Sequence, residues 1–375
     1  MKAILRRLCL SVMAIAVVAA VSAEAPANYY TSADGKSGDA LRKALQAIID
    51  NHTVVSYTNL WNLYEASDTR EDGSVWDMYS TCDWTYERDQ CGSYSSVCDC
   101  YNREHSVPKS WFNEGKPMYS DAFHLYPTDG KVNNQRGNFP FGECANGKRL
   151  SNSALGRLGS STFSGYSGTV FEPDDEYKGD FARTYFYMAT RYAGQCESWG
   201  QGVFSSANCG LTDYAVALFM KWHREDPVSE KERVRNDAIY GIDNSTGYKQ
   251  GNRNPFIDYP CLAEYIWGNR KGAAVDFSML TSSYAPGFDD LGDRSGCNCD
   301  ETYMEYVEQH DITCYQRGNE LHVLNLTPKG TVSIYSINGI TIERRTDCSR
   351  EETFSLQTGM YILVAGDRHI KIIIR

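Results

Sequence analysis

Residues 101–143 concentrate the side chains of this chain that are best suited to chemistry. Glu104 and His105 are adjacent there, and His124 and Asn133 follow. A carboxylate beside a histidine can both hold a divalent cation and accept a proton from water. Prolines and glycines interrupt the stretch, which favours loops and short elements over a packed core. The pattern indicates a polar site for metal-assisted hydrolysis.

Hydrolysis of a phosphodiester needs a base for the attacking water and positive charge near the leaving oxygen. His105 suits the first task because its pKa lies near neutrality, and a cation held by Glu104 suits the second. Neighbouring side chains of an extended strand point to opposite faces, so Glu104 can face the cation while His105 faces the water. The second ligand is either Asn133, giving the oxygen set that Mg²⁺ prefers, or His124, which would admit Mn²⁺, zinc or nickel.

Each of these residues also has a structural interpretation. His124 stands between Phe123 and Leu125, which fits a buried histidine with satisfied hydrogen bonds. Asn133 and Asn138 are residues typical of turns and helix starts. The basic residues of the stretch could form a solvated surface: Arg103, Lys109, Lys131 and Arg136. From the residues alone, the chain is a metal-assisted hydrolase whose substrate is open.

Helices are the main elements expected around this stretch. Apolar residues recur at helical spacing in several segments. These segments are residues 37–50, 57–64, 178–192, 214–225, 227–240 and 262–267. Residues 75–80 alternate in polarity, which predicts a strand. Residues 147–168 are rich in glycine and serine, which predicts loops.

The tail changes character from about residue 312. It consists of short β-branched runs, and Asn338-Gly339 between two of them is a strong hairpin signal. The predicted class is therefore α+β. We expect a mostly helical mixed domain at residues 24–290, a linker at residues 291–311 and a small all-β domain at residues 312–375.

The N-terminus is typical of a secretory signal. Basic residues precede an apolar run at residues 8–21, and residues 21–23 form a small-x-small cleavage site. The run is too short for a confident membrane span, although an uncleaved anchor is the alternative. We expect a signal peptide at residues 1–23, export through the periplasm and no stable membrane span.

Cysteine usage agrees with export. One of the thirteen cysteines lies in the predicted signal, which leaves an even number in the mature chain. An even number in an exported protein favours disulfides, whose pairing cannot be deduced from the sequence. A zinc site is the alternative, but the one-residue gaps of Cys98-Asp99-Cys100 and Cys297-Asn298-Cys299 are tighter than those of structural zinc motifs.

The charge balance limits the class of partner. The formal net charge is -11, which argues against a generic polyanion binder because such proteins are usually basic. If nucleic acid is the substrate, positive charge must be gathered locally or supplied by a metal. Salt-sensitive activity is then expected.

Several longer strings of residues resemble the endonuclease I family of secreted and periplasmic bacterial nucleases. They are Glu104-His105-x-x-Pro108, Asp121 to Pro127, Val132-Asn133 with Arg136-Gly137-Asn138, Phe171 to Asp180, and Gly251 to Pro255. The resemblance implies a ββα-metal core inside a mostly helical mixed fold. It also implies magnesium-dependent, largely sequence-nonspecific cleavage of DNA, and often RNA, to 5′-phosphate ends. Mn²⁺ or another divalent cation is the alternative cofactor.

The same resemblance implies roles for individual residues. His105 falls on the general base, and Glu104 and Asn133 fall on metal ligands. Arg136 would hold a phosphate or orient the site. His124 would support the site, and it stands with Asn138 as a second choice for metal binding or orientation. The residues expected to line the nucleic-acid cleft are Arg103, Lys109, Lys131 and Arg183.

The tail resembles the C-terminal sorting domains that Bacteroidetes proteins use for type IX export. The resemblance rests on residues 332–339, 359–364 and 370–374. This resemblance implies contact with the secretion machinery and a secreted or surface-associated monomer. Two other functions stay open: a surface-binding or adhesion protein on an inactive nuclease scaffold, and a zinc-dependent hydrolase of another phosphoester.

Overall fold

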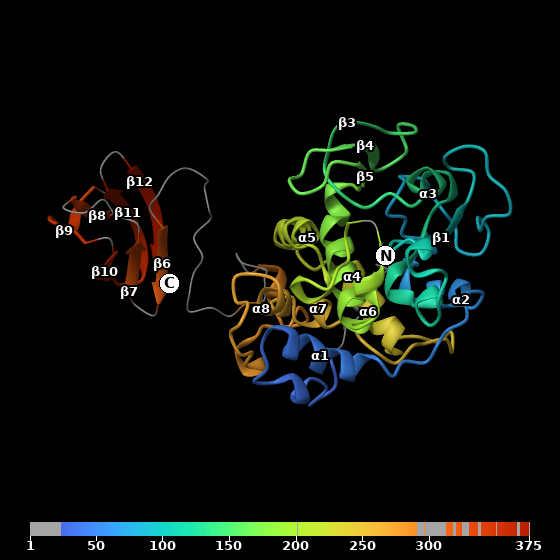
Figure 1. Ribbon diagram of the computed structural model, residues 1–375, viewed down its shortest axis with the longest axis horizontal. Helices are drawn as coiled ribbons and strands as arrows, with labels where there is room; N and C mark the ends of the chain where they lie inside the picture. The colour runs from blue at the N-terminus through green and yellow to red at the C-terminus, as the bar shows by residue number, and fades with distance from the viewer. Residues whose placement is uncertain are drawn as a thin grey trace, which may run out of the picture. The chain divides into compact units, whose positions relative to one another are not determined.

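The computed structural model divides the chain into two compact units, Met1–Cys297 and Asn298–Arg375 (Figure 1). It describes residues 24–200, 202–290, 297, 313–317, 320–324, 330–336, 339–349, 351–365 and 368–374. The predicted signal peptide lies outside these residues, as does the predicted linker apart from Cys297. Among the described residues, no helix combines the length and hydrophobicity that crossing a bilayer requires.

Helix α4 (Lys178–Arg191) is the centre of the first unit. All of its residues are buried, so the predicted apolar face belongs to a helix enclosed on every side. Helices α1 (Gly38–Ile49), α5 (Asp213–Glu225) and α7 (Pro255–Asp258) pack against it, and Figure 1 shows it passing through the middle of this unit.

The other predicted helices are also present. They are α2 (Leu60–Ser67), α6 (Glu230–Tyr240) and α8 (Leu262–Ile266). The start of α6 is fixed at Glu230 because Ser229 and Glu232 form a capping box. Single 3₁₀ turns are η1 Thr31–Ala33, η2 Lys109–Phe112, η3 Met118–Ser120, η4 Ala122–His124, η5 Asp175–Tyr177, η6 Cys196–Ser198, η7 Asn208–Gly210, η8 Phe277–Met279 and η9 Phe288–Asp290.

A two-stranded antiparallel sheet and a helix stand at the centre of the chemically rich stretch. Strand β1 (Tyr101–His105) pairs with β2 (Leu125–Asp129), so that Glu104 lies opposite Tyr126. Helix α3 (Gly130–Arg136) follows β2 directly. The chain therefore forms the ββα unit that the resemblance implies.

A second sheet lies partly within the segment expected to be loops. Strands β3 (Cys144–Lys148), β4 (Arg157–Ser161) and β5 (Thr169–Glu172) pair in that order. The prediction of loops at residues 147–168 is wrong for β4 and for the last two residues of β3, because glycine and serine carry no hydrophobic alternation. The strand predicted at residues 75–80 is also wrong, since the segment makes only isolated bridges such as Ser80 with Ala154. The unit is mixed α/β, and the expectation of a mostly helical domain is not confirmed.

The second unit is all β in its described residues. One sheet has the order β10-β7-β6 and the other β12-β11-β8-β9. The strands are β6 Thr313–Arg317, β7 Glu320–Leu324, β8 Val332–Ser336, β9 Thr341–Arg345, β10 Glu351–Ser355, β11 Gly359–Ala365 and β12 Arg368–Ile374. Leu321 and Phe354 of the first sheet share a core with Ile334 and Leu363 of the second, as in a sandwich. The predicted hairpin joins β8 to β9, with Gly339 at a φ of 79°.

Disulfides, and not zinc thiolates, account for six of the described cysteines. The pairs are Cys82–Cys98, Cys91–Cys100 and Cys261–Cys297. The first two close the segment that leads into β1, and the third ties α8 to the end of the first unit.

Candidate active site

Strand β1 turns its side chains to two different sides, because alternate residues of a strand face opposite ways. Asn102 and Glu104 share the side that meets α3, where the Asn133 Nδ2 donates to Asn102 Oδ1 at 2.6 Å. Arg103 and His105 share the other side, where both lie against the ring of Tyr57. The expected divergence of Glu104 and His105 is therefore present in the structure.

Glu104 is a buried carboxylate with two fixed donors. The Tyr79 hydroxyl lies 2.8 Å and Arg136 Nη1 lies 2.7 Å from the same oxygen, Oε1. Burial raises the pKa of Glu104 to about 7, although Arg136 and Tyr79 favour the charged form. A carboxylate kept from water in this way gains from any further positive charge brought to its second oxygen.

Arg136 joins the end of α3 to the end of β1. Its guanidinium is fully buried and donates to the carbonyl oxygens of His105, at 2.8 Å, and Ser106, at 2.5 Å, as well as to Glu104. Of the two roles expected for Arg136, phosphate contact does not fit this burial. The orienting role fits it, because the guanidinium fixes both a carboxylate and the backbone beside it.

His105 is held in one tautomer. Its Nε2 lies 2.9 Å from the carbonyl oxygen of Tyr119. A carbonyl only accepts, so Nε2 carries the proton and the lone pair stands on Nδ1. Burial, with the neighbouring His124, lowers the pKa of His105 to about 3, so the ring is neutral near pH 7. The fixed lone pair can accept a proton, but the pKa of about 3 lies below the near-neutral value that the sequence led us to expect and that suits a general base.

His124 packs against His105 and is itself fixed by a hydrogen bond. Its Nε2 lies 2.7 Å from the Met118 carbonyl oxygen, and its ring centroid lies 5.5 Å from that of His105. It is fully buried, and burial lowers its pKa. These contacts place His124 on the His105 side of β1, in a supporting position.

Oxygen atoms of the α3 side of β1 suit a hard cation. Since the amide nitrogen of Asn133 is engaged by Asn102, its carbonyl oxygen is the atom left to accept or coordinate. With Glu104 this gives one carboxylate and one amide oxygen, a set that fits Mg²⁺ with several waters retained. Asn138 does not join this set in the structure, because it is exposed beyond the end of α3.

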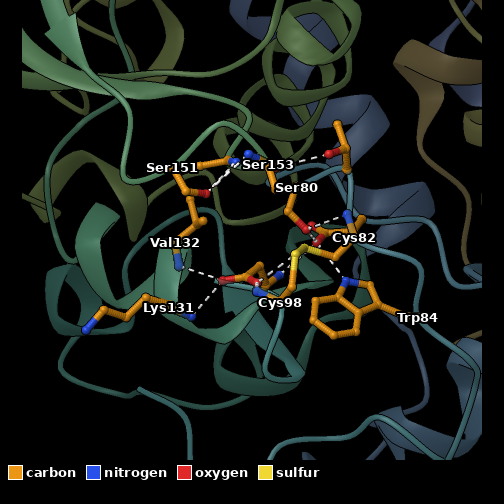
Figure 2. The surroundings of a disulfide bond; sticks show 12 residues. Ser80, Cys82, Trp84, Cys98, Lys131, Val132, Ser151 and Ser153 are labelled. Atoms are coloured by element: carbon orange, nitrogen blue, oxygen red, sulfur yellow. Dashed lines mark hydrogen bonds between the residues drawn. A yellow bond between two sulfur atoms is a disulfide. The ribbon is translucent and has the colours of Figure 1, made fainter. Parts of the chain in front are cut away.

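The start of α3 is fixed by an aspartate and a disulfide. Asp129 Oδ1 accepts from the backbone amides of Lys131 and Val132, at 2.8 and 2.9 Å, and its Oδ2 accepts from the Cys98 amide at 2.7 Å. Figure 2 shows these bonds converging beside the Cys82–Cys98 disulfide. The disulfide loop thus helps to set the helix that carries Asn133 and Arg136.

Potential metal-ligand atoms from three or more His, Cys, Asp or Glu residues come together at one place in the described residues, and that place is beside this disulfide. Atoms of Cys82, Cys98 and Asp129 lie within 4.8 Å of one another. The two sulfurs are bonded to each other, so they are not thiolates that could hold zinc. The zinc alternative therefore gains no support here.

Of the four residues expected to bind nucleic acid, Arg103 lies against the Tyr57 ring and Lys109 lies near the adjoining Tyr119 ring. Arg103 and Lys131 are partly exposed, and Lys109 is exposed with its Nζ 2.7 Å from Glu114. Arg183 is fully buried in α4, where Nε and Nη2 bind the two oxygens of Glu232 at 2.6 and 2.8 Å. Direct contact between Arg183 and a substrate does not fit that position.

Sequence reasoning missed several residues that surround the site. Tyr79 is distant in sequence and lies in the segment misread as a strand. Tyr57 and Tyr119 contact His105 through their rings, at centroid distances of 5.6 and 5.2 Å. Only Asn102 carried a usable signal, because it stands two residues before Glu104 and therefore on the same face of a strand.

Comparisons with known proteins identify the family of this chain. The extracellular ribonuclease of Bacillus subtilis (strain 168) is 35% identical over 263 residues, 68% of this chain and 84% of that protein. The extracellular ribonuclease of Bacillus amyloliquefaciens is 38% identical over 244 residues, which cover 64% of this chain and 78% of that protein. An extracellular deoxyribonuclease of Aeromonas hydrophila is 29% identical over 149 residues, which cover 40% of this chain and 53% of that protein. The Endonuclease I family model matches residues 37–261, more than half of the chain, which therefore belongs to the Endonuclease I family.

Proposed function

We propose that this protein is an exported, divalent-cation-dependent endonuclease that hydrolyses phosphodiester bonds of DNA or RNA with little sequence preference. The observation that carries the proposal is the ββα unit, in which Arg136 holds Glu104 on one side of β1 and His105 stands on the other. Family membership supports a nuclease, and the similar proteins are named for RNA in some cases and DNA in others. Their extracellular names support export.

Glu104 and Asn133 are the residues that we assign to cation binding. Mg²⁺ bound there would supply the positive charge that stabilises the phosphate and the leaving 3′ oxygen. Tyr79 and Arg136 keep the Glu104 carboxylate in place through Oε1, which reserves Oε2 for the cation. Asn102 accepts a hydrogen bond from the amide nitrogen of Asn133, which fixes the side chain and leaves its carbonyl oxygen for the cation. Mn²⁺ suits the same oxygen set.

His105 is the residue that we assign to water activation. Its Nδ1 takes a proton from water while Nε2 keeps its bond to the Tyr119 carbonyl. The water oxygen then bonds to phosphorus and the bond from phosphorus to O3′ breaks, which leaves a 5′-phosphate. The leaving O3′ takes a proton from solvent water and becomes a 3′-hydroxyl. Arg136 takes no part in these transfers, because its guanidinium is occupied by Glu104 and two carbonyl groups.

The second unit is assigned to export. Its sandwich has a hydrophobic core of its own, which is compatible with a part that acts apart from the nuclease site. We propose that it serves as a type IX sorting domain, that the predicted signal peptide directs passage to the periplasm, and that the mature protein is a secreted or surface-associated monomer.

Cleavage assays with the purified chain test the enzymatic proposal. Plasmid DNA and RNA are incubated with Mg²⁺, with Mn²⁺ and with a chelator, for the wild type, for His105→Ala and for His322→Ala in the second unit. We expect metal-dependent cleavage that falls by about 10²- to 10⁴-fold in His105→Ala, the usual contribution of a general base, and is unchanged in His322→Ala. Intact polymers with every cation would refute the activity, and full activity of His105→Ala would refute the mechanism.

A further inference from the structure

Three rings and one guanidinium lie in contact on the His105 side of β1. We call them the stacking cluster: Tyr57, Trp61, Arg103 and Tyr119. The guanidinium carbon of Arg103 lies 3.7 Å from the centre of the Tyr57 ring and 4.4 Å from that of Trp61. The Tyr57 ring in turn lies 4.9 Å from Tyr119. The cluster therefore continues from one ring to the next without interruption.

The stacking cluster reaches the residue assigned to water activation. The Tyr57 and His105 rings are nearly parallel, at 17°, with centroids 5.6 Å apart. The carbonyl oxygen of Tyr119 holds His105 Nε2. A group stacked on this cluster would therefore lie next to the scissile phosphate.

Exposure and charge separate the cluster from ordinary core packing. All four of its members are partly exposed, whereas Glu104 and His105 are buried. In the described part of the chain Arg103 makes no salt bridge, and its Nη1 donates to the Tyr57 carbonyl oxygen at 2.5 Å. Its positive charge is thus unpaired although the chain as a whole is acidic. Exposed Lys109 lies 5.7 Å from the Tyr119 ring, and its charge is paired with Glu114 at 2.7 Å.

Ring faces interleaved with cations are the chemistry that binds unpaired bases. A nucleobase stacks on an aromatic ring or a guanidinium plane, while nearby positive charge holds its phosphate. In a duplex, each base is already stacked on its neighbours and cannot present its face to a protein ring. Trp61 meets Tyr64 and Tyr101, and the rings of the cluster pack against the core of the first unit. All three rings nevertheless remain partly exposed, and the Arg103 guanidinium lies against two of them.

We propose that the stacking cluster binds an unpaired base beside the scissile phosphate, so that the enzyme prefers single-stranded RNA or DNA to duplex. This inference rests on the proposed nuclease function. It assigns Tyr57 and Trp61 to base stacking and Arg103 to both stacking and phosphate attraction.

Matched variants of the full mature chain test this assignment. Tyr57→Leu and Trp61→Leu keep apolar volume but remove the ring, and Tyr57→Phe keeps the ring. Tyr166→Leu removes a partly exposed ring that packs at a tilt against Tyr214 in another segment. The kcat/KM values are measured on labelled single strands of RNA and of DNA and on the matching duplexes. We expect both ring-deletion variants to lose roughly ten-fold on single strands, the effect of one stacked base, with little change on duplex. Tyr166→Leu should match the wild type, whereas Tyr57→Phe, which keeps the ring, should keep the wild-type ratio of single-strand to duplex activity.

An abasic series provides a readout that misfolding cannot imitate. Single strands lacking one base at each position in turn are bound in the presence of chelator, and affinity is followed by fluorescence anisotropy. In the wild type one position near the cleaved bond should lose roughly ten-fold in affinity, and Tyr57→Leu should be insensitive to that position. A flat series in the wild type, or an unchanged ratio of single-strand to duplex activity in both leucine variants, overturns the stacking cluster. A wild type that cuts no polymer overturns the nuclease instead, and the binding series still decides the cluster.

Discussion

Arg136 and Glu104 form a buried ion pair whose two members should respond differently to removal. Arg136→Met leaves an unpaired buried carboxylate, and breaking one partner of such a pair costs about 3–5 kcal/mol. The double variant Arg136→Met with Glu104→Gln removes that unpaired charge, so it should regain much of the stability while staying inactive. Urea unfolding in chelator, with cleavage assays alongside, measures both quantities. Equal instability of the single and double variants would contradict the view of Arg136 as a positioning residue.

A second buried carboxylate, that of Glu172, makes the free energy of unfolding depend on pH. It lies far in sequence from the residues assigned to cation binding. Burial raises the pKa of Glu172, but bonds from Arg157, the Cys144 amide and Lys178 outweigh burial and hold the pKa at about 2. Because the folded pKa lies below the ordinary value, the contribution of Glu172 is fully present above about pH 4.5. It is lost as the pH falls toward 2. Unfolding free energies measured between pH 6 and 3 should fall less steeply in Glu172→Gln, and parallel curves would refute the prediction.

At the scale of elements, the two separate disulfides Cys82–Cys98 and Cys261–Cys297 should have separable effects. Replacing either pair by serine should lower the free energy of unfolding by about 2–4 kcal/mol. The loss should be larger for the second pair because it closes the longer loop. Only the first pair supports Asp129 at the start of α3. We therefore expect a several-fold rise in the Mg²⁺ concentration needed for half-maximal cleavage for Cys82→Ser with Cys98→Ser, and none for the other pair. A metal titration below the melting temperature of both variants measures this, and equal curves would contradict it.

Elements with strong periodicity could be predicted from the sequence, and weak ones could not. Helix α4 was predicted from the spacing of Phe181, Tyr185 and Met188, although its burial on every side was not. Strands β3 to β5 were missed because glycine and serine carry no hydrophobic alternation. Glu104 and His105 were proposed because their types carry the chemistry, whereas Asn133 was chosen over His124 only through the family resemblance. Their partners Tyr79 and Tyr57 lie well upstream, and only the tertiary fold brings them near.

At the scale of the whole molecule, the two units have separate hydrophobic cores. We expect residues 24–297, which retain all three disulfides, to fold and to cleave nucleic acid as fast as the full mature chain. Calorimetry of the full chain should then show two transitions, of which one matches that of the shortened chain. A shortened chain that is folded but inactive would show that the second unit contributes to catalysis.

The two-sided arrangement of β1 makes activity a test of strand pairing. A slip of β1 by one residue would exchange its sides, so that Arg103 and His105 would turn toward α3 and Glu104 would leave Arg136. Such a molecule could keep most of its helices and appear folded by spectroscopy, yet it would have neither a cation site nor a positioned base. The specific activity of a preparation therefore counts the molecules in the correct register, and it is a stricter measure of refolding than helix content.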